Sequence, residues 1–114
     1  MRWLQSRNAA ALAALDAGTP GVVRAELRRA RLQLASTRAV LRRAAEDGDA
    51  APALLPRQMV LLGRVERLQA SVAGAVERRG AADSQITADS KSALEQARVA
   101  LDELAASLEA AAGP

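Results

Sequence analysis

Apolar residues recur every three or four positions along four stretches of the chain, which is the period of an α-helix with one buried face. Short segments rich in glycine, proline, threonine and aspartate separate these stretches. We therefore expect four helices, at about residues 2–16, 20–47, 53–79 and 83–112. Short loops make consecutive helices antiparallel. The predicted fold is all-α: an up-and-down antiparallel helical bundle, with a short N-terminal helix and three long helices, in a single domain over residues 1–114.

The second predicted helix carries two apolar rows instead of one. The main row has heptad spacing and comprises Val23, Leu27, Ala30, Leu34, Thr37, Leu41 and Ala44. The opposite row comprises Val22, Ala25, Leu32, Ala39 and Val40. A helix at the edge of a small bundle needs only one apolar face. The helix therefore either packs centrally within the monomer or contacts a second copy or a partner helix.

The other three helices each have one expected buried row. These rows are Leu4, Ala11, Leu12 and Leu15; Leu54, Leu61, Val65, Leu68, Val72 and Ala75; and Leu94, Ala97, Leu101, Leu104, Leu108 and Ala111. The apolar face of the third helix is widened by Leu55, Met59, Leu62 and Val76. Trp3 is expected to plug the end of the core. Gly18, Gly48 and Gly80 are expected to end helices, and Thr19 to cap the helix that begins at Pro20.

Composition narrows the range of functions. The chain has no Cys and no His, which removes disulfides, thiolate metal sites and the commonest general base. No carboxylate pair lies in an apolar setting, and no glycine-rich phosphate loop is present. We therefore expect no enzymatic activity, no cofactor and no metal. No apolar run approaches the roughly 20 residues that span a bilayer, and no signal peptide is evident, which favours a soluble, cytoplasmic protein.

Charge is concentrated on the second helix. Residues 21–43 contain seven arginines and one glutamate, and a single helical face carries Arg24, Arg28, Arg31, Arg38 and Arg42. This face either grips phosphates, pairs with acids on a partner, or is simply the solvated side. The fourth helix carries an acidic heptad row of Glu95, Asp102 and Glu109. The two rows would pair within the monomer if the second and fourth helices touch, although Arg98 competes for the acids locally.

Gly63 and Gly74 lie eleven residues apart, on one face of the third helix and away from its main row. Small residues let another helix approach closely; the alternative is that they only weaken helix propensity. The predicted interface residues are accordingly Arg24, Arg28, Arg31, Arg38, Arg42, Leu32, Gly63 and Gly74.

The segment Arg24-Ala25-Glu26-Leu27-Arg28-Arg29-Ala30-Arg31-Leu32-Gln33-Leu34-Ala35 resembles the α-helical hairpins of bacterial efflux adaptor proteins. The resemblance covers at most the second and third helices, and the lipoyl-type β segments that flank such hairpins are missing. It implies a helical hairpin and no particular function.

These patterns favour a non-enzymatic helical interaction or assembly module, acting through helix–helix contacts as a subunit or adaptor of a bacterial complex. Its expected partner is a second copy or another helical protein. The alternative is a basic nucleic-acid-associated protein that uses the arginine face, consistent with a pI near 10.9. The modest net charge of +3 and the single aromatic residue, Trp3, oppose it. A fragment of a larger coiled-coil protein, or a designed bundle, is a further alternative.

Overall fold

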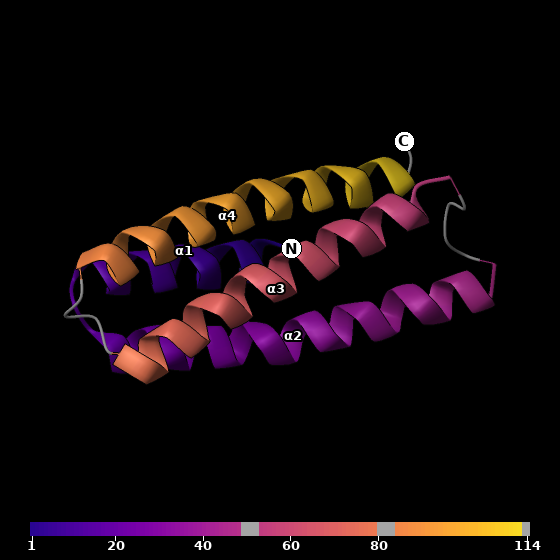
Figure 1. The fold of residues 1–114 in the computed structure, drawn as a ribbon. Helices are drawn as coiled ribbons and strands as arrows, with labels where there is room; N and C mark the ends of the chain where they lie inside the picture. The colour runs from indigo at the N-terminus through magenta and orange to yellow at the C-terminus, as the bar shows by residue number, and fades with distance from the viewer. Residues whose placement is uncertain (49–52, 80–83, 113–114) are drawn as a thin grey trace.

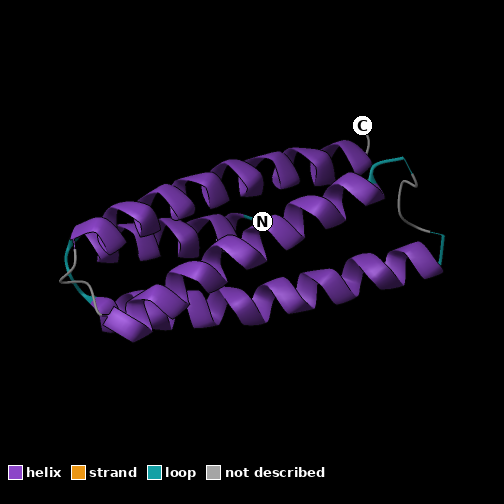
Figure 2. Ribbon diagram, viewed as in Figure 1, coloured by secondary structure: helices purple, strands orange, loops and turns teal. Residues whose placement is uncertain are grey.

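The computed structural model describes residues 1–48, 53–79 and 84–112. These residues form four helices and no strand: α1 (Arg2–Asp16), α2 (Pro20–Glu46), α3 (Leu55–Arg79) and α4 (Ser84–Ala112) (Figures 1 and 2). The predicted antiparallel bundle of one short and three long helices is thereby confirmed. α3 begins two residues later than predicted, which places Pro56 in the first turn, where its missing N–H breaks no helical hydrogen bond.

The helices form a closed ring of neighbours. α1 and α3 each lie between α2 and α4, so α2 and α4 are diagonal to each other. The bundle measures 48 × 21 × 19 Å. α1 has 15 residues where the other helices have 25 to 29, and the N-terminus accordingly lies midway along the bundle (Figure 1). One half of the molecule is therefore a four-helix bundle and the other half is built from three helices.

The ends of α1 and α2 are set by glycines, as the sequence predicts. Gly18 has φ +71° and Gly48 has φ +75°, a region of backbone space that other residues rarely adopt. Thr19 is the N-cap residue of α2, but its side chain does not cap the helix; the hydroxyl donates instead to the Ala14 carbonyl at 3.0 Å. The prediction for Gly80 falls outside the described residues.

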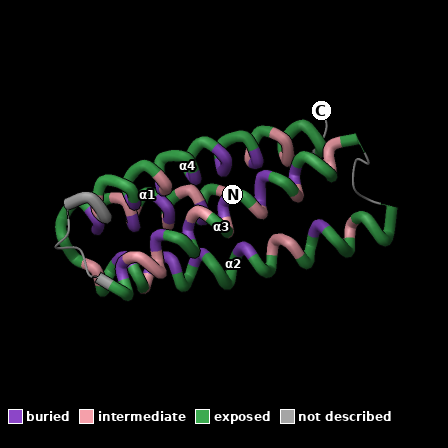
Figure 3. Tube along the Cα trace, viewed as in Figure 1, coloured by how far each residue is buried: buried purple, intermediate pink, exposed green. Residues whose placement is uncertain are grey.

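The buried rows of α1, α2 and α4 lie largely where the apolar pattern puts them (Figure 3). Exceptions are Ala111, which is exposed, and Leu12, Thr37, Ala44 and Leu108, which are half-buried. The row predicted for α3 is confirmed in part: Leu61, Val65 and Val72 are buried, whereas Leu54, Leu68 and Ala75 are half-buried. Leu62 and Val76, predicted to widen the apolar face, are also buried. Two glutamines, Gln58 and Gln69, complete the inward side, and apolar periodicity did not predict them.

Trp3 does not plug the core, and that prediction was wrong. Its side chain is 47% exposed, and Leu4 next to it is buried instead. The inward side of α1 is occupied by Leu4, Asn8, Ala11 and Leu15, which leaves Trp3 turned outward. Its ring lies 5.9 Å from the guanidinium carbon of Arg7, one turn further along the helix.

A buried amide pair crosses the core. Gln69 of α3 donates from Nε2 to Asn8 Oδ1 of α1 at 3.0 Å, and Asn8 donates from Nδ2 to the Leu94 carbonyl of α4 at 3.0 Å. The pair therefore ties three helices together at one height. Sequence reasoning missed both residues, although Asn8 lies four residues from Leu4 and Gln69 lies four from Val65, each on the buried side.

Candidate partner-binding groove between α2 and α3

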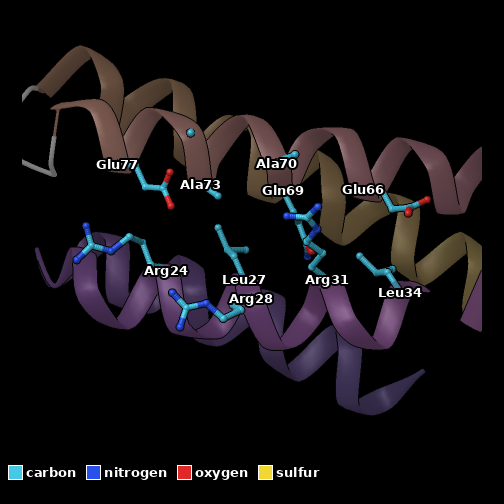
Figure 4. Close-up of a pocket in the computed structure, with 11 residues that line it drawn as sticks. Arg24, Leu27, Arg28, Arg31, Leu34, Glu66, Gln69, Ala70, Ala73 and Glu77 are labelled. Atoms are coloured by element: carbon cyan, nitrogen blue, oxygen red, sulfur yellow. The ribbon is translucent and has the colours of Figure 1, made fainter. Parts of the chain in front are cut away.

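A groove of about 450 Å³ runs between α2 and α3 (Figure 4). We call it the basic groove. Its α2 side is formed by Arg24, Leu27, Arg28, Arg31 and Leu34, and its α3 side by Glu66, Gln69, Ala70, Ala73, Gly74 and Glu77. Leu27 and Leu34 point from α2 toward α3 and form an apolar floor, and both are buried (Figure 4).

Arg24, Arg28 and Arg31 lie on one helical face because they are spaced by four and three residues. None of the three guanidinium groups has an ion pair or hydrogen bond with any side chain that the structure describes. A guanidinium keeps its charge at all physiological pH values and offers five N–H donors in a planar fork. The α2 side of the groove therefore presents three charged donor groups free to bind an anion.

Several polar side-chain contacts join α4 to each of its neighbours, whereas few join α2 to its neighbours. Arg7 of α1 binds Glu26 of α2 at 2.6 Å, and Lys91 of α4 binds Asp16 at the end of α1 at 2.7 Å. Several such contacts join α3 to α4, including Gln58 donating to Ser107 Oγ at 3.1 Å. Between α2 and α3, the described residues form one ion pair, Arg38 with Glu66. Among the described residues, α2 is therefore joined to each of its two neighbouring helices by a single ion pair.

Gly74 on the α3 side of the groove and Gly63 beyond its end have side chains, and no backbone of a neighbouring helix, as their nearest atoms. A Cβ atom built on Gly74 would lie 3.1 Å from Nη1 of Arg78, and one built on Gly63 would lie 3.3 Å from Nη1 of Arg67 and 3.7 Å from Nη2 of Arg38. These neighbours are the ends of flexible arginine side chains, with no backbone among them. Close approach of a helix at Gly63 and Gly74 is therefore unused within the monomer.

The structure brings together most of the residues that the sequence singled out. Arg24, Arg28, Arg31 and Gly74 line the basic groove itself. Arg38 and Gly63 adjoin its end, through the ion pair of Arg38 with Glu66.

Two of the predicted interface residues lie elsewhere. Leu32 is 70% exposed and lies outside the groove lining, as does Arg42, which is exposed near the end of α2. Sequence reasoning had missed Glu66, Gln69 and Glu77 as groove residues; the available signal was that Glu66 and Glu77 are spaced eleven residues apart, like Gly63 and Gly74.

The proposed pairing of the arginine row with the acidic row of α4 is wrong, because α2 and α4 lie diagonally across the bundle. The acids bind locally instead: Arg98 donates to Glu95 at 3.1 Å and to Asp102 at 3.2 Å. Hydrogen bonding to Glu95, together with the negative charges of both acids, raises the pKa of Arg98 above its usual value.

Central packing of α2 within the monomer is also wrong. Val22, Leu32 and Val40, from the second apolar row, are all exposed large side chains. α2 therefore contacts its own bundle with one side only, and its second row faces outward.

Comparison of the chain with protein-family models, with curated proteins and with solved structures finds no match. Among the described helices, none is both long and apolar enough to cross a membrane. Fold and groove together define the class: a small antiparallel helical bundle with an arginine-lined groove between two of its long helices.

Replacing Gly74 with alanine is expected to raise the free energy of unfolding by about 0.5–1 kcal/mol, because alanine has the higher helix propensity and the nearby Arg78 side chain can shift. Replacing Gly18 with alanine is expected to lower the free energy of unfolding by about 1 kcal/mol, because alanine is strained at φ +71°. Urea unfolding of both variants measures the two changes. Destabilisation by Gly74→Ala would mean that something other than Arg78 occupies the space.

Proposed function

We propose that this protein is a non-enzymatic helical interaction module that binds another protein through the basic groove. The observation that carries the proposal is the row of three arginines, Arg24, Arg28 and Arg31, which have no ion pair or hydrogen bond to a described side chain and lie beside an apolar floor. Charged and apolar groups placed side by side on a rigid pair of helices are characteristic of helix–helix recognition. A subunit or adaptor of a bacterial, cytoplasmic complex is the role we propose for such a module.

Nucleic-acid binding is the second candidate, and the same arginines favour it, since a basic helix face attracts phosphates. The chain contains one aromatic residue, Trp3, and it lies on α1, outside the groove lining. Base stacking would therefore have no aromatic platform among the residues that line the groove. The apolar floor of Leu27 and Leu34 also offers no donor to a sugar–phosphate backbone. These features rank protein binding first.

The test is photo-crosslinking from inside the groove in the cells that make the protein. A benzophenone amino acid replaces Ala70, which lines the groove and is exposed. The matched control position is Ala106, which is exposed on α4. We expect a discrete protein adduct from position 70, resistant to nuclease, at a yield at least about tenfold above that from position 106.

Replacing Arg24, Arg28 and Arg31 together with glutamine is expected to abolish the position-70 adduct while the bundle stays folded, because these side chains are exposed and form no ion pair or hydrogen bond with a described side chain. A nuclease-sensitive adduct would favour the nucleic-acid alternative. Equal adducts from positions 70 and 106 would contradict the groove as the working surface.

A further inference from the structure

The basic groove and its end carry an excess of positive charge that extends beyond the α2 row. Arg78 lies over Gly74, and Arg67 and Arg38 both lie over Gly63, as the short distances to built Cβ atoms show. The face therefore combines Arg24, Arg28, Arg31, Arg38, Arg67 and Arg78 with two acids, Glu66 and Glu77. Glu66 is already bound by Arg38. Whatever binds here has to supply negative charge.

This charge excludes a second copy docking face to face. In a two-fold symmetric contact the same face meets itself, so each groove would set its arginines against those of its partner. Like charges brought together at an interface cost several kcal/mol.

A head-to-tail contact with the acidic row of α4 is opposed for a different reason. Glu95 and Asp102 are held by Arg98, and Asp102 also accepts from Gln5 Nε2 of α1 at 2.9 Å. Two of the three acids in that row would therefore have to give up existing partners. Head-to-tail contacts also form open chains unless the rotation closes a ring. The complementary acids therefore come from a different protein.

The shape of the groove indicates a helix. Its two sides are long antiparallel helices, and its α3 side is lined by Ala70, Ala73 and Gly74, which permit close backbone approach. Arg24, Arg28 and Arg31 span two helical turns, about 10 Å at 1.5 Å per residue. Acids spaced by four and three residues on one face of a partner helix have the same rise and period. Small apolar side chains beside those acids fit the floor of Leu27 and Leu34.

We infer that the basic groove binds an acidic amphipathic helix of a partner protein, whose carboxylates pair with Arg24, Arg28 and Arg31 and whose apolar side lies against Ala70, Ala73 and Gly74. The inference rests on the proposed function and specifies the partner's chemistry. This mode is helix-in-groove recognition. The ion pairs fix the register of the partner helix along the groove, and the small residues let its backbone lie close to α3.

The test uses a labelled helical peptide of about 20 alanines and leucines, long enough to form a stable helix, with glutamates at the four-three spacing of the arginine row. A second peptide carries glutamine in place of each glutamate. Fluorescence anisotropy at low salt measures binding of both to the full chain. We expect the glutamate peptide to bind, the glutamine peptide to bind at least tenfold more weakly, and added salt to weaken the former.

The triple variant Arg24→Gln, Arg28→Gln, Arg31→Gln is expected to weaken binding of the glutamate peptide by about 10- to 100-fold, the range for three surface ion pairs. The control triple Arg2→Gln, Arg43→Gln, Arg64→Gln removes the same charge from exposed positions outside the groove. It is expected to change binding less than about threefold, since only screened long-range attraction is lost. Gly74→Leu leaves the charge unchanged. It is also expected to weaken binding, because the leucine side chain would fill the space that the backbone of the partner helix needs.

Four results would overturn the inference. Three of them are equal losses in the two triple variants, no binding of the glutamate peptide at low salt, and a salt-dependent dimer in light scattering that the groove triple abolishes. A single-stranded oligonucleotide that binds more tightly than the peptide, and is released by the groove triple, would overturn it in favour of nucleic acid. A nuclease-resistant protein adduct from position 70 combined with no peptide binding would leave the proposed function standing and refute the acidic helix alone.

Discussion

Replacing Leu34 with alanine is expected to lower the free energy of unfolding by about 3 kcal/mol. Leu34 is 1% exposed and belongs to the core cluster that also contains Leu62 of α3 and Leu101 and Leu104 of α4. Truncation removes buried methyl groups and leaves a cavity that rigid helices close only in part. Because a domain of this size is stable by about 5–15 kcal/mol, the loss is a large fraction of the total. Urea unfolding monitored by circular dichroism measures it.

The matched control is Leu32→Ala, two residues away on the same helix. Leu32 is 70% exposed, so its truncation is expected to change the free energy of unfolding by less than about 0.5 kcal/mol. A similar loss in both variants would show that Leu32 is buried in solution, through self-association of the outward face of α2. Light scattering on the same samples distinguishes that case from a change in the monomer.

Replacing Asn8 with leucine is expected to cost about 2–3 kcal/mol, because it leaves the Gln69 amide buried without any partner. Gln69 is 4% exposed, its Nε2 donates to Asn8, and its Oε1 has no hydrogen-bond partner among the described residues. The Leu94 carbonyl, which also loses the hydrogen bond from Asn8, is not left unsatisfied, because it keeps its helical hydrogen bond within α4. Adding Gln69→Met removes the stranded amide, so the double variant is expected to recover most of the lost stability.

The double-mutant cycle of Asn8→Leu and Gln69→Met isolates the coupling from any change in side-chain volume. We expect a coupling free energy of about 2 kcal/mol, from thermal or urea unfolding of the four proteins. A coupling near zero would mean that the two amides do not meet in solution. A conservative control is Gln58→Met, whose partner Ser107 is half-buried and keeps access to solvent, for which a smaller cost is expected.

The two buried glutamines of α3 also show why its buried side was predicted only in part from the sequence. Periodicity counts apolar residues, and both Gln58 and Gln69 lie on the buried side of that helix. The apolar count therefore favoured a row shifted toward Leu68 and Ala75, which are only half-buried. Polar residues are accepted inside because specific partners satisfy them, and those partners come from other helices. The sequence of α3 alone does not indicate that Asn8 and Ser107, on other helices, are the partners of these glutamines.

The basic groove, too, could be predicted only in part from the sequence. The spacing of Arg24, Arg28 and Arg31 established that they share a face, and the spacing of Gly63 and Gly74 established a face of small residues. That these two faces form the sides of one groove depends on the angle at which α2 and α3 pack. The same packing separates Leu32 and Arg42 from the groove, although the sequence placed them in the same interface.

Local chemistry was enough to determine the four helices, their approximate ends and most of the buried rows, because helix periodicity and glycine conformations act over a few residues. Which helices neighbour each other was decided only in three dimensions. Two heptad charge rows, on α2 and α4, are matched in sequence and yet lie diagonally apart, since the short α1 separates them and α3 occupies the other side. Charge pairing of exposed residues contributes too little free energy to set the order of helices around a core, whereas burial of leucine and valine contributes enough. Arg24, Arg28 and Arg31 of α2 consequently have no ion pair or hydrogen bond to any side chain that the structure describes, and they lie beside a groove where a partner can reach them.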